Sequence, residues 1–156
     1  MPSPQPDLTL FTSSLSNTNP VLGATISPSL TITNEPCTGG STNANTFHVG
    51  VYWTTNINFT GATLLGEVPV AGCPANGITT LNPNVTISTN TIPGKYYLGF
   101  KIDDENEIAE CNEGNNGIYY WTINVAATTS TAPTLKINTA NNSAVLIWPT
   151  RGCWYR

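Results

Sequence analysis

The sequence predicts an all-β fold, and three observations favour it. The 156 residues include 25 Thr, which suit half-buried pleated surfaces, and 19 Asn, 13 Gly and 12 Pro, which suit turns. Short apolar stretches recur along the chain at regular intervals, with turn-rich segments between them. Within these stretches apolar and polar residues alternate, as they do when one face of a strand is buried.

Seven strands are expected before residue 126, each at a run of β-forming residues. They are Leu8–Leu15, Ala24–Asn34, Thr46–Thr55, Thr63–Val70, Val85–Ser88, Lys95–Ile102 and Gly117–Val125. Alternation assigns inward-facing sets to three strands: Phe47, Val49, Val51 and Trp53; Tyr96, Leu98, Phe100 and Ile102; Tyr119, Trp121, Ile123 and Val125. Seven short strands with such loops predict an immunoglobulin-like β-sandwich over residues 6–126.

A linker and a tail are expected after the sandwich. Residues 127–133 are small and polar and end in a proline, which predicts the linker. In the tail, 134–156, Asn141 and Asn142 separate two β-forming runs, Leu135–Thr139 and Ala144–Trp148, which predicts a hairpin. Because two strands alone are marginally stable in water, we expect the tail to pack on the sandwich, to pair with another chain, or to begin a truncated next domain.

Charge is scarce, and this excludes several functions. Asp, Glu, Lys and Arg make up 9% of the chain, and the net charge is −4. Five basic residues cannot neutralise a run of phosphates, so nucleic acid is not an expected partner. No apolar run approaches the roughly 20 residues of a spanning helix, and no signal-peptide core follows Met1. The proline-rich start predicts a linker, as in a mature or excised piece of a larger protein.

One segment concentrates the acid: six of the nine Asp and Glu residues lie between Asp103 and Glu113. Carboxylate and amide oxygens at short spacing are the ligands that calcium prefers. The expected calcium ligands are Asp103, Asp104, Asn106, Glu110 and Glu113, although their spacing is not that of an EF-hand loop. The alternative is a long strand connection whose Asn and carboxylate side chains bond to the loop's own amides.

The same segment resembles a known family. The run from Gly94 to Asn116, GKYYLGFKIDDENEIAECNEGNN, is similar to the signature of CARDB domains, which are cell-adhesion-related domains of bacterial surface proteins. Pro6–Leu10 resembles the first strand of the family, and Val49–Trp53 followed by Leu64–Gly66 resembles a further family stretch. The resemblance covers about residues 6–125. It implies an extracellular immunoglobulin-like sandwich without catalytic activity, although family members commonly carry Ser at the position of Cys111.

Four cysteines suggest disulfides in an oxidising compartment, because their spacing matches no zinc motif. Cys37, Cys73 and Cys111 fall in the second–third, fourth–fifth and sixth–seventh connections, which emerge at one end of such a sandwich. We favour a Cys37–Cys73 bridge, with Cys37–Cys111 as the alternative. Cys153 lies in the tail and is expected to pair with the remaining cysteine, to bridge two chains, or to stay free.

Catalysis is not expected. His48 is the single histidine, and its parity places it on the outward face of its strand. No nucleophile motif accompanies it. Glu67 and the acidic segment supply carboxylates, but nothing in the sequence sets the separation that a glycosidase needs.

Binding is the expected function, in one of three forms. The first is an adhesion or accessory module that contacts proteins or glycans at the cell surface or spaces other domains. The second is a carbohydrate-binding module that uses Tyr52, Tyr97 and Tyr120, whose parity places them outward on neighbouring strands. The third is a fibre or surface-layer subunit whose apolar segment Ala144, Val145, Leu146, Ile147 and Trp148 adds a strand to the next molecule. No cofactor other than calcium is expected.

Overall fold

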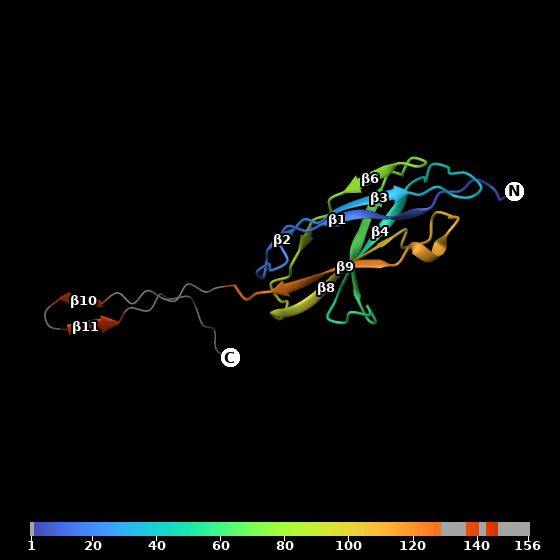
Figure 1. The fold of residues 1–156 in the computed structure, drawn as a ribbon. Helices are drawn as coiled ribbons and strands as arrows, with labels where there is room; N and C mark the ends of the chain where they lie inside the picture. The colour runs from blue at the N-terminus through green and yellow to red at the C-terminus, as the bar shows by residue number, and fades with distance from the viewer. Residues whose placement is uncertain (1, 129–136, 141–142, 147–156) are drawn as a thin grey trace.

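The chain folds as two antiparallel sheets packed face to face, as Figure 1 shows for this computed structural model. The structure describes residues 2–128, 137–140 and 143–146. One sheet has the order β1-β3-β6, formed by Leu8–Ser14, Ser29–Asn34 and Ile78–Leu81. The other has the order β5-β4-β8-β9, formed by Thr63–Val70, Phe47–Thr54, Gly94–Ile102 and Ile118–Val125. The predicted all-β, immunoglobulin-like sandwich is therefore confirmed.

Smaller elements complete the described chain. The two-residue strands β2 (Thr25–Ile26) and β7 (Val85–Thr86) pair with each other, and a 3₁₀ turn, η1, spans Glu113–Asn115. A separate two-stranded sheet, β10 (Ile137–Ala140) with β11 (Ser143–Leu146), lies in the tail. Over the ranges that the structure describes, no helix has the length and apolarity needed to cross a membrane.

Alternation along the strands builds the core as expected. On β4, Phe47 and Val49 are fully buried, and on β8, Leu98 and Phe100 are at most 1% exposed. Ile123 of β9 is also fully buried, while the predicted inward residues Trp53, Tyr96, Tyr119 and Trp121 are partly buried and pack against this cluster. The opposite sheet contributes Leu8, Leu30 and Ile32. The strand period of two residues thus placed the inward faces correctly.

The strand predictions fail at two places. The expected strand Ala24–Asn34 is divided into β2 and β3, because Ser27 and Pro28 lie between them and proline has no N–H for a ladder. The sequence did not predict β6, a four-residue edge strand that pairs with β3. In β6 Ile78 is 56% exposed and Leu81 is buried, so the run lacks the apolar alternation that marks longer strands.

The tail forms part of the predicted hairpin. Ile137 pairs with Leu146 and Ala140 with Ser143, in antiparallel register. The predicted turn residues Asn141 and Asn142 lie outside the described residues. Of the predicted donor strand, Ala144, Val145 and Leu146 belong to β11, while Ile147 and Trp148 lie outside the described residues, as does Cys153. The division into sandwich, linker and tail stays a prediction.

Candidate functional site

Three chain segments meet at one end of the sandwich, and the candidate functional site lies among them. Figure 1 shows the N-terminal segment, the β3–β4 connection and the β8–β9 loop gathered at this end. We call the β8–β9 segment Asp103–Asn116 the acidic loop. The backbone N–H of Cys111 in this loop donates to the carbonyl of Pro6, 3.0 Å away. This hydrogen bond joins the acidic loop to the segment that precedes β1.

A disulfide ties the acidic loop to the β3–β4 connection. It joins Cys37 to Cys111, with Cα atoms 6.2 Å apart and a sequence separation of 74. The favoured pairing of Cys37 with Cys73 is wrong, and the alternative is correct. Cys73 is 1% exposed and its Sγ lies inside, 3.6 Å from the carbonyl oxygen of Gly77. Burial raises the pKa of this thiol, which favours its inert, protonated form.

Asp103 shapes the beginning of the acidic loop. It is 2% exposed and has φ +46°, and its carboxylate accepts hydrogen bonds from the backbone N–H groups of Glu107 (2.9 Å) and Ile108 (3.0 Å). Asn106 has φ +55°, and its N–H donates to the carbonyl of Asp103. Asp and Asn tolerate this left-handed region and satisfy turn amides. The chain therefore reverses tightly here, and Ile108 is buried behind the turn.

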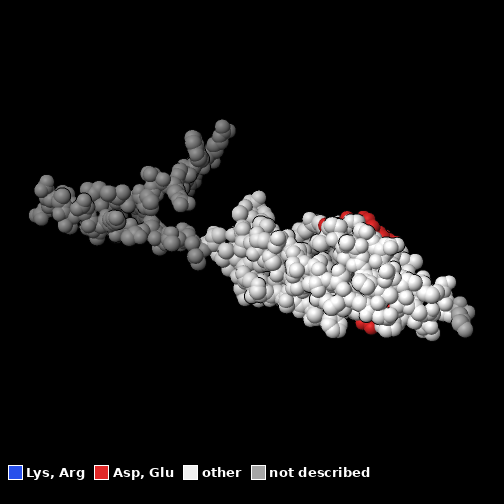
Figure 2. Space-filling view, turned by 90° about the horizontal axis from the view of Figure 1, so that it is seen from above, with Lys and Arg blue, Asp and Glu red and all other residues white. Residues whose placement is uncertain are grey.

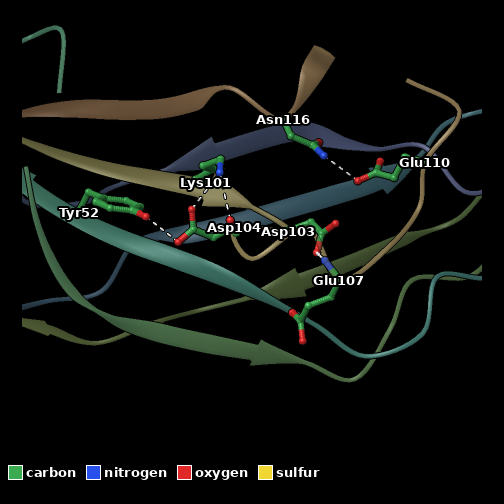
Figure 3. Close-up of polar contacts among 7 residues, drawn as sticks. All are labelled: Tyr52, Lys101, Asp103, Asp104, Glu107, Glu110 and Asn116. Atoms are coloured by element: carbon green, nitrogen blue, oxygen red, sulfur yellow. Dashed lines mark hydrogen bonds and ion pairs between the residues drawn. The ribbon is translucent and has the colours of Figure 1, made fainter. Parts of the chain in front are cut away.

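Asp104 fixes the loop to the outer face of the four-stranded sheet. Its carboxylate accepts a 2.6 Å hydrogen bond from the Tyr52 hydroxyl and pairs with the Lys101 ammonium at 3.2 Å (Figure 3). Desolvation and this hydrogen bond raise the pKa of Tyr52 to about 12. The carboxylate lies over Gly50, where a Cβ atom would come 2.7 Å from the Asp104 Cγ.

Glu110 anchors the far half of the loop. It is 6% exposed, and its carboxylate accepts hydrogen bonds from the Leu8 N–H and, at 2.7 Å, from Asn116 Nδ2 (Figure 3). Burial raises its pKa to about 7, although the two hydrogen bonds oppose the shift. The Glu110 N–H in turn donates to the Glu113 carboxylate at 2.8 Å. The Glu110 carboxylate, through its bond to the Leu8 N–H, therefore holds the loop against β1.

The structure does not bring the five predicted calcium ligands to one point. The carboxylates of Asp103, Asp104 and Glu110 point to different partners (Figure 3), and Glu113 bonds to a loop amide. These contacts support the alternative, in which the side chains satisfy the loop's own donors. Calcium binding by these residues stays a prediction.

A second group of ionisable side chains gathers beside the loop. His48 Nδ1 lies 2.9 Å from Glu107 Oε2, and one ligand atom from each of His48, Glu105 and Glu107 lies within 4.8 Å of the others. The hydrogen bond to Glu107 raises the pKa of His48. Desolvation and the neighbouring Glu105 carboxylate raise the pKa of Glu67. We call these four residues the His48 cluster.

The sequence contained a signal for this cluster that the prediction did not use. His48 on β4 and Glu67 on β5 both have outward parity, and the register pairs His48 with Pro69 and Gly50 with Glu67. His48 and Glu67 are therefore diagonal neighbours on one face. On the face in Figure 2 the acidic residues are grouped in patches, and no Lys or Arg of the described residues is visible there.

The predicted tyrosine surface is only partly exposed. Tyr120 is 45% exposed, but Tyr97 is 8% exposed, so its predicted exposure is wrong. The Tyr97 ring packs edge-on against Tyr120, with centroids 5.6 Å apart, and Lys95 Nζ lies 5.1 Å above it. Phe59, from the β4–β5 loop, lies 5.6 Å from Tyr120 and was not predicted. Carbohydrate binding by Tyr52, Tyr97 and Tyr120 stays a prediction.

Comparison with known proteins identifies the family. The CARDB family model matches residues 5–119. The chain belongs to the CARDB family. The CARDB domain of a Pyrococcus furiosus protein, solved in complex with di-metal ions, is similar with a TM-score of 0.59 and 21% identity, over 81% of this chain and 93% of that one. A domain of a proposed cell-surface protein from Methanosarcina acetivorans gives 0.52 and 21%, over 78% and 93%.

A similar sandwich also occurs inside an enzyme. A β-glucosidase from Listeria innocua, solved with glucose, matches this CARDB domain with a TM-score of 0.53 and 17% identity, over 77% of this chain but 16% of the glucosidase. At 17–21% identity these likenesses show a shared fold. CARDB is a family of non-enzymatic domains. No curated protein sequence matches the chain.

Proposed function

We propose that this CARDB domain is a non-catalytic extracellular module of a secreted or surface protein, which contacts protein or glycan partners or spaces neighbouring domains. The observation that carries the proposal is the Cys37–Cys111 disulfide. Disulfides persist in oxidising compartments and are rare in the cytosol. The likeness to a domain of a proposed cell-surface protein supports the same compartment.

The chemistry of the acidic loop supports a binding role over a catalytic one. The buried carboxylates of Asp103 and Glu110 accept hydrogen bonds from backbone amides, so they serve to hold the loop. A loop that is fixed by these bonds and by a disulfide presents a rigid surface, and rigid surfaces lose less entropy on binding.

The compartment is tested on intact cells that produce the protein. A membrane-impermeant amine-reactive label should modify the domain, and a thiol reagent applied without reductant should leave Cys37 and Cys111 unmodified. Peptide mapping by mass spectrometry reads both results. A cytosolic marker protein in the same cells is the control and should stay unlabelled. A domain that is protected from the amine label and has both thiols reduced would overturn the proposal.

We also propose divalent cation binding by the acidic loop, with calcium as the ion. Two buried acceptors support it, because the Oδ1 atoms of Asn115 and Asn116 have no hydrogen-bond donor within the described residues. Asn115 bonds through Nδ2 to the Asp7 carboxylate and Asn116 through Nδ2 to the Glu110 carboxylate, at 2.7 Å each, so each pair brings together the two kinds of oxygen that calcium prefers. The di-metal complex of the Pyrococcus furiosus CARDB domain supports the same class of ligand.

Thermal melting tests the calcium proposal. A cation that binds the folded state raises the melting temperature as its concentration rises above Kd. We expect millimolar calcium to raise the melting temperature and a chelator to reverse the rise, with magnesium as the comparison ion. Identical melting curves with calcium and with chelator would leave these oxygens with a structural role alone.

Self-assembly is the remaining candidate, and the tail supports it. β10 and β11 pair with each other as a two-stranded sheet, and such a sheet gains stability when a further strand or a packing surface is added. The sandwich offers a long edge strand, β5, to a tail of this kind. In this form of the proposal the donor strand of one molecule extends the sheet of the next.

A further inference from the structure

We propose that the His48 cluster is a binding site for a divalent transition-metal ion of the Zn²⁺ type. Its donors are the imidazole of His48 on β4 and the carboxylates of Glu105 and Glu107 in the acidic loop, with Glu67 of β5 beside them. These donors are not those of the proposed calcium site, and the two proposals stand independently.

The distances suit an ion of this size. Zinc binds imidazole nitrogen and carboxylate oxygen at about 2.0–2.2 Å in a tetrahedron, so two of its ligand atoms lie about 3.4 Å apart, and two side chains already in contact need to separate only slightly to admit it. His48 Nδ1 and Glu107 Oε2 are separated by 2.9 Å. Glu105 offers a third atom within 4.8 Å of both, a gap that rotation of an exposed glutamate side chain closes. Three protein ligands with an open position are typical of a zinc ion that also holds water.

The charges of the cluster favour a bound cation. The carboxylates of Glu67, Glu105 and Glu107 lie near one another. Among the described residues, His48 is positioned to offset part of their negative charge, since it is hydrogen-bonded to Glu107. The Lys101 ammonium, just before the start of the acidic loop, is paired with Asp104 instead. A divalent ion at the centre converts repulsion among the carboxylates into attraction to the ion.

The backbone holds the donors in place before any ion binds. The Asp104 N–H donates to the His48 carbonyl at 3.3 Å, which docks the loop on β4. The Asp103 carboxylate binds the N–H of Glu107, and this fixes the position of that ligand. His48 and Glu67 lie on paired strands of the sheet. Sites on rigid elements, supported by a surrounding shell of hydrogen bonds, lose little energy to reorganisation.

The donor set also selects the class of metal. Imidazole nitrogen suits zinc, copper and nickel, whereas calcium and magnesium prefer oxygen alone. The other group of potential ligands in the described residues is Asp7, Cys37 and Cys111, and both of its sulfur atoms are bonded to each other. A disulfide offers no thiolate, so the His48 cluster is the better site.

The single histidine allows a direct test on the full chain. Zn²⁺ is titrated by calorimetry, and the imidazole signals of His48 are followed by NMR, where no other histidine overlaps them. We expect one Zn²⁺ ion to shift the His48 signals and to bind more tightly than Ca²⁺. Replacing Glu105→Gln and Glu107→Gln together should weaken Zn²⁺ binding at least about tenfold. Glu35→Gln, a carboxylate outside the cluster, is the matched control and should leave binding unchanged.

Each other outcome counts against the site. Zn²⁺ binding without a change in the His48 signals places the ion elsewhere, for example on thiols, and overturns the inference. So does equal Zn²⁺ affinity in the double variant, provided that its melting curve shows it folded. Zn²⁺ that does not bind at all also overturns it. None of these results bears on calcium binding by the acidic loop, which melting in calcium measures separately.

Discussion

Gly50 is the residue of β4 over which the Asp104 carboxylate of the acidic loop lies. A Cβ atom there would lie 2.7 Å from the Asp104 Cγ and 2.9 Å from the Tyr52 ring. The Gly50→Ala variant should therefore lose about 1–3 kcal/mol of stability, because a side chain is forced into an occupied space. Chemical denaturation measures the loss.

Gly66 on β5 provides the matched control for this substitution. A Cβ atom added there meets nothing within 4 Å, and Gly66 pairs with Val51 one position from Gly50. The Gly66→Ala variant should keep the wild-type stability or gain up to about 1 kcal/mol, because alanine restricts the unfolded chain. Equal losses in the two variants would mean that the Asp104 contact does not limit Gly50.

Glu110 should make the stability depend on pH in an unusual direction for a carboxyl group. Its pKa is about 7 in the folded protein, against 4.5 for the exposed side chain, because burial disfavours the charge. Between these values the folded state binds more protons than the unfolded state, so stability falls as pH rises from about 4.5 to 7. The Glu110→Gln variant should show a smaller fall than the wild type over this range.

Denaturation at a series of pH values measures this difference. Glu35→Gln is the control, because Glu35 lies outside the loop, and it should keep the wild-type dependence. The pKa of His48 is also raised, so its contribution to stability likewise falls as pH rises. This contribution is the same in the wild type and in the Glu110→Gln variant, so it does not affect the comparison. A Glu110→Gln variant with the wild-type pH dependence would show that Glu110 titrates near its ordinary pKa.

At the scale of elements, the disulfide links two long connections that no strand pairing joins. Its loop closes 74 positions, and the loss of chain entropy in the unfolded state predicts about 4 kcal/mol of stabilisation. The Cys37→Ser, Cys111→Ser double variant should be less stable by about this amount in denaturant. Reductant should bring the wild type to the same midpoint and leave the variant unchanged. If the variant is as stable as the oxidised wild type, the disulfide does not contribute to stability and the hydrogen bonds of the loop suffice to hold it.

The positions of most strands were predictable from the sequence, because they follow local alternation of apolar and polar residues. The pairing of the cysteines was not. Phe47, Val49 and Val51 mark the inward face of β4 in the sequence itself. In contrast, the choice of Cys111 over Cys73 depends on depth, since Cys73 lies inside the sandwich and Cys111 on its surface. No local pattern reports how deep a loop residue lies.

For the candidate site, too, local features were predictable from the sequence and contacts between distant segments were not. The acidic loop was recognised from its composition and from its likeness to the CARDB signature, and it is a long strand connection as expected. The meeting of His48 with Glu105 and Glu107 depends on the two left-handed residues Asp103 and Asn106, which turn the loop back toward β4. Sequence spacing alone does not reveal that turn.

At the scale of the whole molecule, β5 is an edge strand that can pair with another chain. It is eight residues long, it pairs with β4 on one side, and Leu64 and Leu65 are 46% and 49% exposed. A groove of about 330 Å³ lies between β5 and the segment Pro83–Val85. Glu67 and Pro69 oppose strand addition at one half of this edge, whereas the half from Thr63 to Gly66 carries neither charge nor proline and is a template for a further strand.

If the tail supplies that strand to a second molecule, assembly should require both partners. Each molecule would then offer one donor and one acceptor, so the contacts would not close and chains of molecules would grow with concentration. Light scattering after size-exclusion chromatography should show assemblies for residues 1–156 and monomers for residues 1–128. The Leu65→Lys variant should also be monomeric, because a charged edge residue opposes strand addition, whereas Ile92→Lys, at an exposed position in the β7–β8 connection and not on the edge strand itself, should assemble normally. A chain of residues 1–156 that stays monomeric at high concentration would contradict assembly through the tail and favour the module that spaces or presents its neighbours.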